Sequence, residues 1–417
     1  MIARGAVLLA LAALAAGCDR RRDLDDPFGR QIAEAIPAIE HATGLKFLTP
    51  PRLELRTRDE ARDFLLAKFS ETSPAEMIRG VEMAYKAFGF VDDTLDLQRF
   101  LLDLLTEQVA GYYDPVTKAV YLVRDAPDHV ARIVLTHELV HALQDQHLNL
   151  DSIQRMRGNS DRQAAAQAVI EGQATWVQMK IALGGDDFAT RMPGGWEAVR
   201  QQIREAQTAM PRFAAAPMVL QESLIFPYLA GAEFVRRFDM RRDPRLPLSA
   251  LPVSTEQVLS EQAFFGEPPD LPTTVSLPGR MPAGGFEEVM GQFGIRLFLL
   301  QHGRDAAVAV SGAAGWDGDR YRVFPVRGGR AVVWASVWDT PVDAAEFVDA
   351  AGQATLRRYR AGAPSTSGTT RSYLGSGRSV TISQRAIGGR NVVVFVDVPA
   401  GTAGPIIDPA RITLGDS

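Results

Sequence analysis

Two histidines and a glutamate in the segment LTHELVHALQDQH, residues 135–147, have the spacing of a metal site. Residues four apart on an α-helix lie on one face, so His137 and His141 can bind a single ion. Glu138 lies beside them, where its carboxylate can take a proton from a water that the metal polarises and pass it to a leaving amine. Zn²⁺ lowers the pKa of such a water toward about 7 and polarises a carbonyl group. The segment therefore predicts hydrolysis at a zinc ion.

The alternative is that the two histidines are packing groups on a buried helix. Apolar residues such as Val134, Val140 and Leu143 surround them, so the site is expected to be dry. Buried imidazoles without a metal would each need other hydrogen-bond partners. The metal site is the simpler interpretation of the pattern.

Catalytic zinc sites use three protein ligands, and the sequence offers two candidates for the third. His147 follows His141 at the spacing of the metzincins, in which a glycine midway lets the chain leave the helix. Here that residue is Gln144, and in a continuous helix His147 would point away from the ion. The other candidate is Glu171, in VIEGQAT on a predicted Ala-rich helix at 160–183 whose small residues permit close approach.

The remaining pattern predicts an α+β chain. GYYDPVTKAVYLV, residues 111–123, has the composition of two strands joined by an Asp-Pro turn directly before the histidine-bearing helix. Ser160 to Gln163 is a capping box, and further helices are expected at 196–206, 217–238 and 342–359. RGGRAVVWASVWD and IGGRNVVVFVDVP each place a Gly-Gly turn before a β-rich run, which predicts antiparallel hairpins in the C-terminal part.

The N-terminus predicts export and a lipid anchor. A basic start and a 13-residue apolar run, Gly5 to Gly17, form a signal-peptide core too short to span a bilayer. The run ends in LAAGC, which resembles a bacterial lipobox, and Cys18 is the only cysteine. Lipidation there would hold the protein in the bacterial cell envelope on the periplasmic or other extracytoplasmic side. The formal charge of −5 includes no long basic block, so nucleic acid is not an expected partner.

A histidine pair with a distant glutamate on a second helix resembles the gluzincin metallopeptidases. The blocks AGYYDPVTKAVYLV, LTHELVHALQDQH, VIEGQAT, FPYLAGAEFV, STEQVL and GWDGDRY are similar to those of a little-characterised family of bacterial, often lipid-anchored, HExxH proteins. In the wider gluzincin pattern an Asp often follows the Glu by four places. This chain has Thr175 there, so Asp145 and Asp161 are candidates to support the ligands instead.

The resemblance implies a zincin-like peptidase fold, helix-rich with a small mixed sheet. Val120 to Val123 would then be the edge strand that pairs with an extended peptide or protein substrate. A tyrosine commonly helps zinc to stabilise the oxyanion. Tyr228 in FPYLAG is the first candidate for that role, with Tyr112 or Tyr113 behind it.

These observations predict a membrane-anchored zinc metalloendopeptidase with one catalytic Zn²⁺. The alternative is a non-catalytic envelope lipoprotein that uses a zincin-like fold for binding. The expected organisation comprises a signal peptide at 1–17, a lipid-anchored tether and short helix at 18–50, a zincin-like catalytic domain at 51–242, a proline-rich wrap or linker at 243–284, and a C-terminal α+β domain at 285–417 with antiparallel hairpins.

Overall fold

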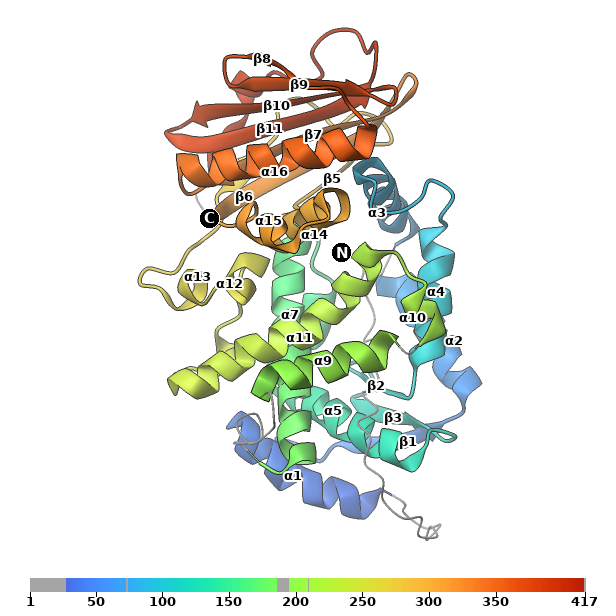
Figure 1. Ribbon diagram of the computed structural model, residues 1–417. Helices are drawn as coiled ribbons and strands as arrows, with labels where there is room; N and C mark the ends of the chain where they lie inside the picture. Colours follow the sequence, from blue (N-terminus) through green and yellow to red (C-terminus); the bar gives the residue numbers. More distant parts are fainter. Residues whose placement is uncertain (1–27, 73, 186–194, 209, 416–417) are drawn as a thin grey trace.

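The computed structural model of the protein describes residues 28–72, 74–185, 195–208 and 210–415, so the predicted signal peptide and Cys18 lie outside it. A helical half with a three-stranded sheet precedes a half built on a seven-stranded antiparallel sheet (Figure 1). The predicted α+β class is thus confirmed. Over the described ranges, no helix combines the length and the apolar character needed to cross a membrane.

The first half contains most of the helices. Its elements are α1 (Gly29–Thr43), β1 (Arg52–Arg56), α2 (Arg58–Thr72), α3 (Ala75–Phe88), α4 (Leu97–Gln108), β2 (Gly111–Asp114), β3 (Ala119–Val123), α5 (Asp128–His147), α6 (Leu150–Gln154), α7 (Ser160–Leu183), α9 (Gly195–Thr208), α10 (Pro211–Ala214) and α11 (Met218–Arg241). The connecting segment contributes η1 (Pro247–Ser249), α12 (Thr255–Leu259), α13 (Glu261–Phe265) and β4 (Thr274–Ser276).

The second half contains β5 (Phe286–Glu288), α14 (Gly291–Gly303), α15 (Ala306–Ser311), β6 (Trp316–Val326), β7 (Gly329–Trp338), α16 (Pro341–Tyr359), β8 (Ser365–Ser367), β9 (Thr370–Gly375), β10 (Arg378–Ile387), β11 (Arg390–Pro399), η2 (Pro409–Arg411) and β12 (Thr413–Gly415). The strand order is β5-β6-β7-β11-β10-β9-β8, and β4 pairs with β12 in a separate ribbon. Helix α16 lies across the large sheet (Figure 1). The predicted hairpins are β6–β7 and β10–β11.

The small sheet corrects one prediction. Its order is β1-β3-β2, with β1 parallel and β2 antiparallel to β3. The predicted edge strand, Val120 to Val123, therefore lies at the centre, because β1 pairs with it along its whole length. All five β3 residues are buried and mostly apolar, as expected for a strand with a neighbour on each side. The edge next to α5 is β2.

Helix α7 packs closely against α11. A Cβ atom added to Gly172 of α7 would lie 2.1 Å from the backbone carbon of Gly231 in α11, and one added to Gly231 would lie 1.8 Å from the carbonyl oxygen of Ala168. No side chain fits in such a contact, so glycine at both positions lets the backbones touch. The contact brings Glu171 and Tyr228, each within one turn of these glycines, to the same place.

The N-terminus of α7 is fixed to the second half of the chain. The N-cap is Asn159, whose side chain accepts from the Arg162 amide, so the predicted capping box at Ser160 is wrong by one residue. The Ser160 amide instead donates to Glu288 Oε1 at 3.1 Å. The Thr255 amide donates to Asp161 Oδ2 at 3.1 Å.

The two halves also share apolar packing. The ring of Phe88 in α3 meets Phe298 of α14 and Tyr321 and Trp334 of the large sheet edge to face, with centroids 6.0, 5.1 and 5.7 Å away. The largest buried cluster includes residues of both halves. The domain boundaries predicted near residues 242 and 285 stay a prediction. The described residues on the two sides of them pack against each other in one apolar cluster.

The α7–α11 contact can be tested with Gly231→Ala. We expect the free energy of unfolding to fall by about 1–3 kcal/mol, because the new methyl group forces two backbones apart. Urea unfolding measures the change. Gly303→Ala at the end of α14 is the matched control, since nothing lies within 4 Å of an added Cβ there. Equal stability of the two variants would contradict the proposed contact.

Candidate metal centre

Helix α5 presents His137 and His141 on one face, as their spacing predicts. Their ring centroids are 4.8 Å apart at an interplanar angle of 82°. Glu171 of α7 meets both rings: its Oε2 lies 3.3 Å from His137 Nε2 and 3.4 Å from His141 Nε2. The histidine side chains are 4% and 5% exposed and that of Glu171 is 14% exposed. The structure thus brings the three predicted metal ligands together in a largely dry space.

Hydrogen bonds on the far side of each ring define what faces the centre. His137 Nδ1 lies 3.0 Å from Gln178 Oε1, and His141 Nδ1 lies 2.8 Å from Gln144 Oε1. A carboxamide oxygen only accepts, so each Nδ1 carries the hydrogen. In a neutral imidazole the lone pair is then on Nε2, facing the Glu171 oxygen.

Three electron-rich atoms therefore converge, and a positive charge among them is needed to hold them there. Buried His141 Nε2 makes no hydrogen bond of good geometry among the described residues, although it lies 3.4 Å from Glu171. Burial works to lower the pKa of His141, yet the carboxylates of Glu171 and Glu138 raise it to about 9. A buried nitrogen without a good hydrogen bond and a pKa raised by nearby carboxylates are both expected where a cation binds.

Zn²⁺ fits this set of donors. Two imidazole nitrogens and one carboxylate oxygen are a common protein ligand set for catalytic zinc. His141 Nε2 is buried and lacks a good hydrogen bond among the described residues, and a bound ion would satisfy it. His137, His141 and Glu171 are the residues that would hold the ion.

Glu138 is the second carboxylate of the centre. It is fully buried, and no hydrogen bond of good geometry reaches either of its oxygens within the described part of the chain. A ligand atom of Glu138 lies within 4.8 Å of those of both histidines. Burial raises the pKa of Glu138 against the opposing effect of the histidines, and the backbone amide of Tyr113 on β2 favours the charged form. A raised pKa makes this carboxylate a stronger proton acceptor.

Tyr228 of α11 also reaches the centre. Its side chain hydrogen bonds to Glu171, and its ring stacks on His137 with centroids 6.1 Å apart and 27° between the planes. Burial, followed by the charge of Glu171, raises the pKa of Tyr228 well above 10. The phenol therefore stays protonated and can donate a hydrogen bond.

The two tyrosines ranked behind Tyr228 have other partners. The ring of Tyr112 stacks on Phe64, with centroids 4.3 Å apart. The Tyr113 hydroxyl donates to Asp145 Oδ2 at 2.8 Å. Of these three tyrosines, Tyr228 is the one whose side chain bonds to a predicted ligand.

His147 lies away from the three ligands. Helix α5 continues without a break to this residue, and His147 Nε2 lies 2.8 Å from the carbonyl oxygen of Lys46. Gln144 is helical, so the chain does not turn at the point where a metzincin would leave the helix. The geometry favours Glu171 over His147 as the third ligand.

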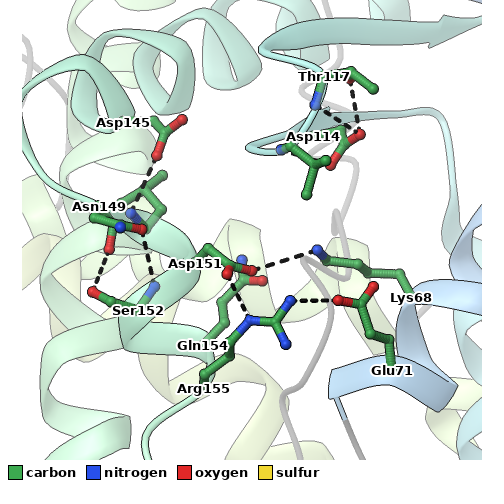
Figure 2. Close-up of polar contacts among 12 residues, drawn as sticks. Lys68, Glu71, Asp114, Thr117, Asp145, Asn149, Asp151, Ser152, Gln154 and Arg155 are labelled. Atoms are coloured by element: carbon green, nitrogen blue, oxygen red, sulfur yellow. Dashed lines mark hydrogen bonds and ion pairs between the residues drawn. The ribbon is translucent and has the colours of Figure 1, made fainter.

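Asp145 and Asp161 do not support the ligands as predicted. Asp145 binds Lys118 Nζ at 2.6 Å and accepts from the Leu150 amide at 3.2 Å, which joins α5 to the start of α6 (Figure 2). Asp161 lies at the start of α7, where it accepts from the Thr255 amide.

The corner beside Asp145 is held by further ion pairs. Figure 2 shows Asp151 of α6 between Lys68 of α2 and Arg155, at 3.6 and 2.6 Å, with Glu71 bound to the same arginine. Charged side chains thus tie α6 and the residue after it to α2. Their role is structural, since none of them contacts the histidines.

The sequence did carry a signal for the true supporting residues. Gln144 follows His141 by three places on α5, and Gln178 follows Glu171 by seven on α7, so each pair shares a helix face. Thr175, on the same face as Gln178, is buried and its hydroxyl has no hydrogen-bond partner in the described chain. Amides rather than carboxylates support this centre.

The choice of third ligand gives a direct test. We expect Glu171→Ala to lose tight zinc binding, because it removes the carboxylate oxygen that lies 3.3 and 3.4 Å from the two imidazole nitrogens. His147→Ala should keep a full equivalent of zinc and lose only the contact with Lys46. Metal analysis of the purified variants measures both. Full zinc in the Glu171 variant together with loss in the His147 variant would transfer the site to the metzincin arrangement.

Comparison with known proteins adds little to this geometry. Residues 280–403 match a family model described as "Domain of unknown function (DUF8575)", a segment that excludes α5, α7 and α11. No curated protein matches the sequence. Among solved structures, the chain is similar to one described as a "putative hydrolase with a novel fold" from Chloroflexus aurantiacus, with a TM-score of 0.33 and 17% identity over 60% of this chain and 92% of that one. A likeness this distant carries no functional argument.

Proposed function

We propose that the protein is a zinc metallopeptidase of gluzincin type with a zincin-like catalytic region. His137, His141 and Glu171 would hold the ion, and Glu138 would be the general base. When bound, Zn²⁺ would supply Lewis-acid chemistry, polarising a water and the scissile carbonyl.

One observation carries the proposal: Glu138 is fully buried, and among the described residues no side chain bonds to its oxygens, the Tyr113 backbone amide being the group that favours its charged form. A buried carboxylate without a strong hydrogen bond costs free energy of folding. A protein that used this fold only for binding would have no need of such a group. A peptidase needs it, because the carboxylate must be free to accept a proton.

The protein's own groups account for the proton transfers. Glu138, with a pKa raised by burial, would take the proton of the attacking water and later deliver it to the leaving amine. Tyr228 stays protonated next to Glu171. Its hydroxyl could exchange that hydrogen bond for one to the negative oxygen that develops on the scissile carbonyl.

The position of β2 supports a peptide as substrate. All four β2 residues pair with β3. The Val123 amide donates to the Ala110 carbonyl, so in the alternating antiparallel ladder the backbone groups of Gly111 and Tyr113 point away from β3. The Tyr113 amide is the one that acts on Glu138. An extended peptide paired with this edge would therefore run past the general base.

Glu138→Gln tests the base. The change keeps the size of the side chain but removes the proton acceptor, so we expect turnover of an unstructured protein substrate to fall by roughly two to four orders of magnitude. Zinc content should stay at the wild-type level, since the three ligands are untouched. A near wild-type rate in the zinc-loaded variant would exclude Glu138 as the base.

We further propose that the exported protein is anchored to a membrane through a lipid on Cys18. The support is the short apolar run before it and the absence of any other cysteine in the sequence. An anchor of more than one acyl chain binds far more firmly than a single myristoyl chain.

For the anchor, Cys18→Ser is the informative change. The variant should either remain an uncleaved precursor or appear in the soluble fraction, because serine offers no thiol for lipidation. Membrane fractionation and the mass of the mature N-terminus give the answer. Unchanged processing and membrane partitioning would rule the lipid anchor out.

A further inference from the structure

Gln144 makes more contacts at the centre than any role in helix formation requires. Its side chain is fully buried on α5, one turn after His141. Its Oε1 lies 2.8 Å from His141 Nδ1, and its Nε2 donates to the carbonyl oxygen of Ile170 at 3.0 Å and to Gln173 Oε1 at 2.9 Å. Ile170 and Gln173 belong to α7 and flank Glu171.

The Ile170 carbonyl fixes the orientation of the Gln144 amide. The side chain of Gln173 could rotate to offer a donor in place of an acceptor, but a backbone carbonyl only accepts. The Gln144 NH₂ group must therefore face α7, and its oxygen must face His141. Reversal would place two oxygens about 3.0 Å apart in a dry interior, where an unpaired acceptor costs about 1–3 kcal/mol.

The orientation of Gln144 in turn determines the tautomer of His141. With an oxygen against it, Nδ1 must carry the hydrogen, so in the neutral ring the Nε2 lone pair is directed at the position shared with Glu171 and His137. The Ile170 carbonyl on α7 thus orients the Gln144 amide, and that amide determines which nitrogen of His141 on α5 faces the centre.

We propose that Gln144 is a positioning residue that fixes His141 as a ligand through Nε2 and couples it to the helix that carries Glu171. The proposal rests on the zinc site proposed above. Gln144 would touch neither metal nor substrate and would act only through His141 and the backbone beside Glu171.

A neutral amide suits this position better than the carboxylate that often supports a histidine ligand. Glu138 and Glu171 already bring two negative charges into the buried centre, and Zn²⁺ would balance both. A carboxylate at residue 144 would add a third charge and would face the oxygens of Ile170 and Gln173 without a proton to share. An amide supplies an acceptor on one side and two donors on the other.

Gln144→Met removes both functions while keeping a similar volume. Loss of a supporting hydrogen bond typically weakens metal affinity by about 10- to 100-fold, and we expect a loss of that size for Zn²⁺ in competition with a chelator. Gln146→Met is the matched control on the same helix. The Gln146 side chain bonds to Leu48 and Thr49 and not to the centre, so the Zn²⁺ affinity of the Gln146→Met variant should stay within about twofold of wild type.

A spectroscopic readout separates positioning from mere packing. The chain has six histidines, so ¹⁵N-histidine labelling of the zinc-loaded protein gives few signals. We expect His141 to coordinate through Nε2 and to show a slowly exchanging Nδ1–H resonance that Gln144→Met broadens or abolishes. The His137 resonance, which depends on Gln178, should persist in that variant.

The outcomes are distinct. Coordination of His141 through Nδ1 in the wild type, or unchanged affinity and an unchanged Nδ1–H signal in Gln144→Met, would overturn the role of Gln144 and leave the zinc peptidase standing. A wild-type protein that binds no Zn²⁺ would overturn both. Should Gln144→Met fail to fold, the wild-type spectrum decides alone, and Gln178→Met should weaken Zn²⁺ binding through His137 in the same way.

Discussion

A buried carboxylate, Glu138, and a half-buried one, Glu171, lie beside two buried imidazoles, and the surrounding structure accommodates their charge. Glu138 and Glu171 lie where water is scarce, so their repulsion is weakly screened and a cation must offset it. The raised pKa of His141 has this origin, since a proton on its ring would partly neutralise the same charge. The side chains that bond to the histidines are neutral amides, which accept a hydrogen bond from each ring without adding negative charge.

Helix α7 is the element that makes this arrangement possible. It contacts α5 on one side and α11 on the other, and it needs small residues because the backbones come so close. Gly172, next to Glu171, is where α11 touches it, and Ile170, on the other side of Glu171, accepts from Gln144. The carboxylate is thus held between two interhelical contacts, so its position depends on both partners.

The second half of the chain contributes to the same positioning. Glu288 accepts from the Ser160 amide, and Thr255 binds Asp161, so the start of α7 is fixed by residues far along the chain. The distance from these contacts to Glu171 is three turns of a helix that is buried along most of its length. The start of the helix that carries Glu171 is therefore held to the large sheet through Glu288 of β5.

Local patterns were predicted well from the sequence, and long-range neighbours were not. His137 and His141 share a face because of helix geometry alone, and the hairpins follow from Gly-Gly turns. The edge strand was assigned wrongly because β1 pairs with β3 across a long separation, and no periodicity reports that pairing. The prediction that Asp145 or Asp161 supports the histidines is wrong, because the rings are bonded to uncharged amide oxygens of Gln178 and Gln144.

Gln144 has both a local effect, on the course of α5, and a long-range effect, through its contact with α7. A glycine there would let the chain leave the helix and bring His147 toward the ion. Glutamine keeps α5 helical, which directs His147 to the carbonyl of Lys46. The same side chain reaches α7 beside Glu171 and binds His141. In the proposed zinc site, one residue would thus remove one candidate ligand and help to hold the other in place, so the choice of third ligand would depend on Gln144 as much as on Glu171.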